Sequence, residues 1–318
     1  MNSTPTAAFG APDARWQLAP GLRVQVRVPA STANLGPGFD CLGLALGIYD
    51  GVVVTVADEG VRVEVTGEAV DDVPRDASHL VARAVIRGLE FAGVAVPGLQ
   101  LECTNVIPHS RGLGSSAAAV VGGLAAASAL IAADGRRPAL TEEELVQLSG
   151  EFEGHPDNAA ASVLGGAVVT WMDNAGGYFA RRLPLHPAIT ATAFVPKTES
   201  STAVTRGLLP DEVPRVDAIF NLSRAALAVV ALTTDPTCLM DATADRLHQD
   251  YRAPAMPETY ALVMALRERG HAATVSGAGP SVLVLGTVEL GEGEATLGAA
   301  AGFEMTSVAI GTGVVLHT

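Results

Sequence analysis

A glycine- and serine-rich segment contains the residues whose types best suit ligand binding. Residues 112–116 read GLGSS, and an Ala-rich apolar run follows them to Ala133. Glycine permits a tight turn and close backbone approach to a ligand, and alanine favours a helix. The first turn of such a helix carries unpaired N–H groups and the positive end of the helix dipole, which together bind anions. We therefore expect this segment to bind nucleotide phosphates, with the hydroxyls of Ser115 and Ser116 available to phosphate or to its metal ion.

Two familiar phosphate-binding motifs match this segment less well. A P-loop requires a lysine beside its second glycine, and the single lysine of the chain is the distant Lys197. A Rossmann fingerprint reads G-x-G-x-x-G, and Ala117 occupies the place of its third glycine. Because alanine is tolerated at that place, a dinucleotide site stays open as an alternative. An ordinary turn before a buried helix is the structural alternative.

A second segment concentrates polar groups between apolar stretches. Residues 151–158 read EFEGHPDN and bring together three carboxylates, an imidazole and an amide. One carboxylate suits Mg²⁺, which keeps most of its waters and takes one or two protein oxygens together with phosphates. A zinc site fits less well, because the segment has no second histidine at helical spacing. The structural alternative is that Asp157 or Asn158 caps the helix that follows.

Two further groups of residues suit the charged ends of a small molecule. Residues 29–40 read PASTANLGPGFD, in which Asp40 can accept from an ammonium and Asn34 can bond a hydroxyl or a carboxylate. Arg206 and Arg252 can each clamp a carboxylate with two parallel hydrogen bonds. Taken singly, the first segment is also an ordinary Pro/Gly turn, and lone arginines are usually solvated.

The elements expected to position these residues alternate without a βαβα rhythm, which favours the α+β class. Strands are expected at 22–28, 52–57, 61–66, 99–107, 167–171 and 282–285, with 52–57 and 61–66 paired as a hairpin. Helices are expected at 80–89, 117–133, 141–152, 216–232 and 257–269. Ser78 is the expected N-cap of the first. Thr141 and Glu144 form a capping box that begins the third, which ends at Phe152. Three parts are expected: a flexible tail (1–20), an ATP-binding domain (21–173) and a C-terminal domain (174–318).

Composition excludes several classes of function. The 318-residue chain has a net charge of −14, which disfavours nucleic acid as a partner. Residues 1–20 lack the basic start and apolar core of a signal peptide, and 117–133 is shorter than a membrane span and contains Gly122 and Gly123. The three cysteines lie far apart, which fits a reducing compartment rather than a disulfide or zinc scaffold. We therefore expect a cytoplasmic protein without a membrane or nucleic-acid partner.

Four segments, in order, resemble the GHMP superfamily of small-molecule kinases, and within it most closely the homoserine kinases. Residues 29–40 resemble the opening motif P-x-[ST]-x-A-N-L-G-P-G-F-D, and 108–118 resemble the ATP loop P-x-x-x-G-L-G-S-S-A-A. Residues 153–158 (EGHPDN) and 276–281 (SGAGPS) resemble two later motifs. The ATP loop and SGAGPS are similar to the whole superfamily, whereas ANLGPGFD together with EGHPDN resembles the homoserine kinases.

This resemblance implies a fold and a reaction. The fold is a two-domain α+β GHMP kinase fold, with an N-terminal domain like domain 2 of ribosomal protein S5 and a ferredoxin-like C-terminal domain. The reaction is transfer of the ATP γ-phosphoryl group to the hydroxyl of L-homoserine, giving O-phospho-L-homoserine for threonine biosynthesis, with Mg²⁺ as cofactor and a homodimer as the assembly. The alternatives are another GHMP kinase, of the mevalonate or diphosphocytidyl-methylerythritol type, and a catalytically silent sensor on the same fold.

The resemblance also implies roles for particular residues. The amino acid would be bound by Asn34, Asp40, His155, Asp157, Thr202, Arg206 and Arg252, and the nucleotide by Pro108, His109, Ser110, Arg111, Gly112, Leu113, Gly114, Ser115, Ser116, Ala117 and Ala118. The residues implied in catalysis are Asp157, Asn158 and Arg206. Ser116 and Glu153 would hold Mg²⁺, with Glu151 open as the alternative carboxylate. Phosphoryl transfer needs little deprotonation of the nucleophile, so we assign Asp157 mainly to positioning, and a role as general base stays open.

Overall fold

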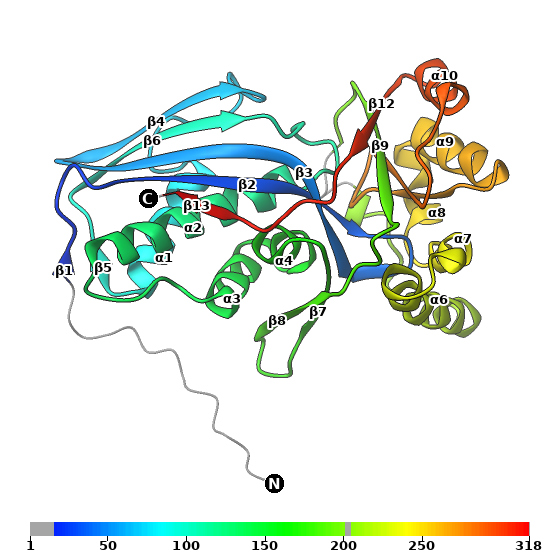
Figure 1. The fold of residues 1–318 in the computed structure, drawn as a ribbon, viewed down its shortest axis with the longest axis horizontal. Coiled ribbons are helices and arrows are strands. Elements are labelled where there is room, and N and C mark those ends of the chain that lie inside the picture. Colours follow the sequence, from blue (N-terminus) through cyan, green and yellow to red (C-terminus); the bar gives the residue numbers. More distant parts are fainter. Residues whose placement is uncertain (1–15, 201–204, 318) are drawn as a thin grey trace, which may run out of the picture.

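The structure, a computed structural model, describes residues 16–200 and 205–317. The larger of its sheets contains seven strands: β2 (Arg23–Asn34), β3 (Gly38–Ala57), β4 (Gly60–Gly67), β6 (Gly98–Asn105), β7 (Ala167–Met172), β8 (Tyr178–Leu183) and β13 (Val315–His317). Their order is β13–β2–β3–β6–β4, and β7 joins β3 and β8 (Figure 1). A short parallel pair, β1 (Trp16–Gln17) with β5 (Val94–Ala95), lies apart from this sheet. In β2 the buried and exposed residues alternate up to Val28, as the sequence predicts for a half-buried strand.

Helices cover one face of this sheet and build the main core with it (Figure 1). They are α1 (Leu80–Phe91), α2 (Ser115–Asp134), α3 (Glu142–Glu153) and α4 (Asp157–Leu164). α2 is buried on nearly all sides, which its apolar composition predicts. Its small residues let α1 approach closely, because a Cβ at Gly123 would lie about 2.5 Å from the Val81 carbonyl oxygen. α3 begins with the expected capping box between Thr141 and Glu144.

The remaining strands form a second sheet with its own core. They are β9 (Thr190–Pro196), β10 (Ala272–Val275), β11 (Val282–Gly286) and β12 (Phe303–Val308), in the order β10–β11–β9–β12. The accompanying helices are α6 (Arg215–Thr233), η1 (Pro236–Cys238), α7 (Leu239–Ala242), α8 (Gln249–Arg252), η2 (Ala253–Ala255), α9 (Pro257–Glu268) and α10 (Glu292–Ala300). The order β9–helices–β10–β11–α10–β12 is the ferredoxin-like βαββαβ arrangement. The expected α+β class with a ferredoxin-like second unit is confirmed.

Length and composition alone would let α2 and α6 cross a membrane, and their burial in the structure differs. In α2, 78% of the most apolar window is buried inside the protein, which identifies it as a core helix. In α6 only 22% of the corresponding window is buried. α6 therefore presents an apolar surface that the described residues leave uncovered.

Two sequence predictions about local structure are wrong. The strands expected at 52–57 and 61–66 form, but they are not a hairpin, because β6 lies between β3 and β4 and pairs with both. Adjacency in the chain favoured a hairpin, whereas the sheet gains two full ladders by inserting β6. The N-cap of α1 is His79 rather than Ser78, since the His79 Nδ1 accepts from the backbone N–H of Val81 at 3.2 Å.

The expected domain boundary between residues 173 and 174 stays a prediction. In the structure this position lies inside the β7–β8 hairpin, and β13 returns to the seven-stranded sheet after β12. Along the chain, the change from one sheet to the other falls between β8 and β9. Of the expected N-terminal tail, residues 1–15 lie outside the described part of the chain, while β1 pairs with β5.

Candidate active site

Three glycine-rich segments from distant parts of the sequence meet through their backbones. The N–H of Ser31 donates to the Leu113 carbonyl at 3.1 Å, and the N–H of Gly277 donates to the Ala33 carbonyl at 3.2 Å. Gly112 has a φ of +74°, and a Cβ there would overlap the Ser276 carbonyl oxygen. Glycine is therefore required for both the turn and the close approach. This contact joins the expected phosphate loop to segments 31–36 and 276–281.

A cavity of about 1020 Å³ opens where these segments meet. Its lining includes most of the residues singled out from the sequence: Asn34, Asp40, His109, Ser110, Arg111, Gly112, Gly114, Ser115, Ser116, Ala117, Glu153, His155, Asp157, Asn158, Arg206 and Arg252. Residues separated by more than 200 positions thus share one cavity large enough for a small molecule and a nucleotide.

The start of α2 supplies the anion-binding part of the cavity. Its N-cap, Gly114, has a φ of +70° and provides no side-chain cap, so the N–H groups of the first turn are not satisfied by a capping side chain. The side chains of Ser115 and Ser116 line the cavity beside them, and the Ser115 Oγ lies 3.2 Å from the His109 Nδ1. This arrangement has the donors and the dipole orientation that phosphate groups require.

The two candidate metal-binding carboxylates lie in different surroundings. Glu153, the last residue of α3, accepts a hydrogen bond from the Ser116 Oγ at 2.8 Å and lines the cavity. Glu151 instead forms an ion pair with Arg87 at 2.8 Å and accepts from Gln147. Glu151 is not among the cavity-lining residues. The hydroxyl and carboxylate pair of Ser116 and Glu153 is therefore the one placed beside the phosphate loop.

The half-buried His155 and the buried Asp157 form an acid–imidazole pair. The Nδ1 of His155 lies 3.1 Å from the Oδ1 of Asp157, which also accepts from the N–H of Asn158 at 2.7 Å. The side-chain hydrogen bond with Asp157 raises the pKa of His155 above its usual 6.5, against the opposing effect of burial. Asp157 is 1% exposed, and its carboxylate and that of Asp40 lie with a His155 ring nitrogen within 4.8 Å of one another. The two carboxylates of this cluster suit a small cation such as an ammonium.

Two positively charged side chains, Arg206 and Arg252, lie beside that cluster. The Arg206 guanidinium makes two hydrogen bonds to the Asp40 carboxylate, at 2.6 Å and 3.2 Å. Arg252 is 1% exposed and contributes to the lining of the same cavity. Arg206 and Arg252 each lie over the Phe39 ring, at 5.6 Å and 5.3 Å from its centroid. Two cations and an adjacent cluster of carboxylates can bind the two ends of a zwitterion.

Some predicted site residues lie elsewhere. Within the expected nucleotide segment, the side chains of Leu113 and Ala118 are buried in the core, at 1% and 0% exposed, and Pro108 is not among the lining residues. Thr202 lies outside the described residues. Residues 277–279, for which the sequence predicts no binding role, also line the cavity. Their composition, a second Gly/Ser-rich loop, was the available signal, but only the contacts with the first loop place them there.

Comparisons with known proteins identify the family of the chain. A family profile described as "GHMP kinases N terminal domain" matches residues 79–166, and one described as "GHMP kinases C terminal" matches residues 223–295. The chain is 62% identical to a homoserine kinase of Rhodococcus erythropolis over 86% of this chain and 90% of that one. It is 53% identical to a homoserine kinase of Mycobacterium tuberculosis over 93% of this chain and 95% of that one. A crystal structure of homoserine kinase from Cytophaga hutchinsonii matches with a TM-score of 0.82 and 26% identity, covering 93% and 97% of the two chains.

Proposed function

The chain belongs to the homoserine kinases of the GHMP kinase family, and from that premise we propose that it phosphorylates the hydroxyl of L-homoserine with ATP. The observation that carries the proposal is the pairing of two recognition features in one cavity. The start of α2 suits phosphates, and Asp40, Arg206 and Arg252 suit an amino acid. A catalytically silent sensor would not need the Ser116–Glu153 pair beside the phosphate loop.

We infer that the amino acid binds by exchanging partners with an existing ion pair. Asp40 and Arg206 are bonded to each other in the structure. An incoming zwitterion offers its ammonium to Asp40 and its carboxylate to Arg206 and Arg252, so each charge keeps a partner of opposite sign. A ligand with only one of the two charges would leave a protein charge unpaired.

The proposed reaction forms a bond between the homoserine hydroxyl oxygen and the γ-phosphorus of ATP and breaks the bond from that phosphorus to the β,γ-bridging oxygen. ADP leaves, and the hydroxyl proton is lost to solvent or to a nearby carboxylate. The transition state is loose, so alignment and charge neutralisation supply most of the acceleration. We assign the alignment to Asp157 and Asn158 at the start of α4, and we keep Asp157 as the candidate acceptor of the proton.

Magnesium fits the residues beside the phosphate loop. The Ser116 hydroxyl and the Glu153 carboxylate are hard oxygen donors already in contact at 2.8 Å, and Mg²⁺ prefers such donors together with phosphate oxygens. We propose that these two residues hold the ion. When bound, it would neutralise negative charge on the nucleotide phosphates.

A panel of acceptors tests the proposed substrate. We expect kcat/KM for L-homoserine to exceed that for 4-hydroxybutyrate, which lacks only the α-amino group, by about 1,000-fold or more, because Asp40 would lose its partner. Mevalonate and galactose should react more slowly still. The measurement is coupled ADP release with each acceptor. Equal turnover of 4-hydroxybutyrate would contradict this assignment of the acceptor.

We also propose that the protein is a homodimer that associates through α6. A stripe of apolar side chains along this helix is exposed, including Val216 (64%), Ile219 (63%), Leu222 (77%) and Val230 (43%). Their spacing of three to eight residues keeps them near one side of the helix. Apolar stripes of this kind on a soluble domain usually mark an interface.

Replacing Leu222 with Asp is expected to convert the dimer to a monomer, because it places a charge in the middle of the apolar stripe. Val288 provides a matched control, since it is 76% exposed but follows β11 and lies outside α6. Val288→Asp should leave the dimer intact. Light scattering coupled to size-exclusion chromatography measures both. The α6 interface is wrong if Leu222→Asp remains a dimer or if both variants dissociate.

We place the reaction in the cytoplasm. Cys41, Cys103 and Cys238 are all free thiols in the structure. Burial raises the pKa of Cys41 to about 11 and that of Cys103 to about 12, with nearby carboxylates adding to the effect, so both remain unreactive thiols. Unpaired cysteines are typical of a reducing compartment.

A further inference from the structure

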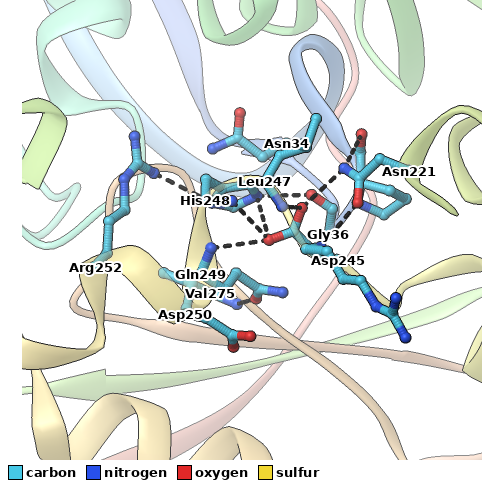
Figure 2. Close-up of polar contacts among 12 residues, drawn as sticks. Asn34, Gly36, Asn221, Asp245, Leu247, His248, Gln249, Asp250, Arg252 and Val275 are labelled. Atoms are coloured by element: carbon cyan, nitrogen blue, oxygen red, sulfur yellow. Dashed lines mark hydrogen bonds and ion pairs between the residues drawn. The ribbon is translucent and has the colours of Figure 1, made fainter. Parts of the chain in front are cut away.

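A buried polar cluster joins the lining of the cavity at Arg252, and Figure 2 shows its polar contacts. We call it the His248 cluster; it comprises Asn221, Asp245, His248, Gln249 and Arg252. Four of these residues are between 0% and 7% exposed, and the side chain of Asp245 is 0% exposed. It connects α6 and α8 with Gly36 and Pro37 and with Val275 at the end of β10. Buried polar groups are costly unless they are paired, so a cluster this well connected specifies one arrangement of the segments it joins.

Asp245 fixes the turn that leads into α8. Its carboxylate accepts from the backbone N–H groups of Leu247, His248 and Gln249 at 2.8 to 3.0 Å. It also accepts from the Asn221 Nδ2 at 2.9 Å. Because the N–H groups at the start of α8 are held in this way, the direction in which His248 leaves the backbone is determined.

The hydrogen bonds of His248 determine where its proton is. The Nε2 lies 2.7 Å from the Gly36 carbonyl oxygen, which can only accept, so the Nε2 carries the hydrogen. The Nδ1 lies 3.4 Å from the Nη1 of Arg252, and a guanidinium can only donate, so the Nδ1 must accept. The ring is therefore the neutral Nε2–H tautomer. Complete burial agrees with this, since it lowers the pKa of His248 below its usual 6.5.

These contacts involve the Nη1 of the Arg252 guanidinium. The Nη1 donates to the His248 Nδ1 and to the Gly277 carbonyl at 3.2 Å. Within the described residues the Arg252 Nε is buried and has no hydrogen-bond partner. The Phe39 ring stacks on the His248 ring, with centroids 5.1 Å apart, and also lies against Arg252. Arg252 is thus held from the side of the imidazole and the Phe39 ring, while it lines the cavity.

We propose that His248 is a positioning residue for acceptor binding: its neutral imidazole bridges Gly36 and Arg252 and holds the guanidinium in the orientation that binds the carboxylate of the acceptor. The inference rests on the proposed function, because it assigns that carboxylate to L-homoserine. His248 does not line the cavity and acts only through Arg252. Its loss should therefore weaken binding of the amino acid without changing the binding of ATP.

Two conservative variants of His248 each keep one of the two hydrogen bonds of the ring and remove the other. In His248→Asn the amide oxygen can occupy the place of the Nδ1 and accept from Arg252. In His248→Gln the amide nitrogen can occupy the place of the Nε2 and donate to Gly36, and the acceptor for Arg252 is lost. We expect His248→Gln to weaken the Kd for L-homoserine by about tenfold or more, the usual scale for loss of a hydrogen bond to a charged group. His248→Asn should remain within about threefold of the wild type, since that contact is kept.

Calorimetry with L-homoserine and, separately, with ATP measures these effects, and the KM of each substrate with kcat provides a second readout. Circular dichroism and thermal melting confirm that the variants are folded, and only folded variants are compared. The proposal predicts a weaker affinity for homoserine with an unchanged affinity for ATP in His248→Gln, and recovery in His248→Asn. Equal losses for both substrates, or equal affinities for homoserine in His248→Gln and the wild type, would overturn it. A wild-type protein that neither binds nor phosphorylates L-homoserine would overturn the proposed function, and this inference with it.

Discussion

Replacing Glu153 with Gln is expected to lower kcat by about 100-fold or more, the scale seen when one group that stabilises transition-state charge is removed. The variant keeps the size of the side chain and its reach to Ser116, but it loses the negative charge proposed to hold Mg²⁺. Binding of L-homoserine should be nearly unchanged, because Glu153 is not part of the Asp40, Arg206 and Arg252 group. The half-activating concentration of Mg²⁺ should rise as kcat falls. Steady-state kinetics over a range of Mg²⁺ concentrations measures both.

Glu151→Gln is the matched control, two residues away on the same helix. It removes an exposed ion pair with Arg87, which is worth about 0–1 kcal/mol, so both activity and stability should stay close to the wild type. If Glu151→Gln is the more damaging change, the metal-binding carboxylate is Glu151. If neither variant changes the requirement for Mg²⁺, the ion is held by other residues.

The second large effect is expected at the start of α2, where Gly114→Val should weaken ATP binding by about 100-fold or more, equivalent to about 2.7 kcal/mol. A Cβ at this position would overlap the Ser31 Oγ and would lie 3.0 Å from the Ser31 carbonyl oxygen. The loop must then move away from segment 31–36, which turns the first N–H groups of the helix away from the phosphates. The valine also has to adopt a φ near +70°, which is strained for a β-branched residue.

A variant at Gly135, at the other end of the same helix, is the control that distinguishes backbone strain from loss of ATP binding. Its φ is +78°, and a Cβ there would meet nothing within 4 Å. Gly135→Val should therefore lose stability from the backbone strain, on the order of 1–3 kcal/mol, while ATP binding is retained. Circular dichroism shows whether each variant is folded, and calorimetry measures its affinity for ATP. A folded Gly114→Val protein with normal ATP affinity would contradict the assignment of residues 112–116 to the nucleotide.

Local features of the fold could be predicted from the sequence because their causes are local. The Ala-rich run gives α2, the pair Thr141 and Glu144 begins α3, and alternation of residue type gives β2. Strand pairing could not be predicted in the same way. β6 lies between β3 and β4 because it forms ladders with both, and the residues of β4 carry no signal that identifies β6 as their partner.

In the candidate site, too, some features could be predicted from the sequence and others could not. Residue type alone indicated which side chains could bind a ligand or a metal ion. The structure brings four of them to one cavity: Asp40, Glu153, Asp157 and Arg252. The His248 cluster was not predicted, because the contact between His248 and Gly36 joins positions 212 residues apart. Arg252 alone is an ordinary arginine in the sequence. Its burial and its bond to a neutral imidazole become evident only in the folded chain.

Identification of the product formed from ATP and L-homoserine is the direct test of the proposed reaction. Phosphorus NMR and mass spectrometry of a reaction containing the purified protein and Mg²⁺ distinguish a phosphate ester on the side-chain hydroxyl from free phosphate. We expect O-phospho-L-homoserine in amounts equal to the ADP released, and about 100-fold less product or lower with Glu153→Gln in the same time. Release of ADP with inorganic phosphate alone, or transfer to another acceptor in preference to L-homoserine, would contradict the account.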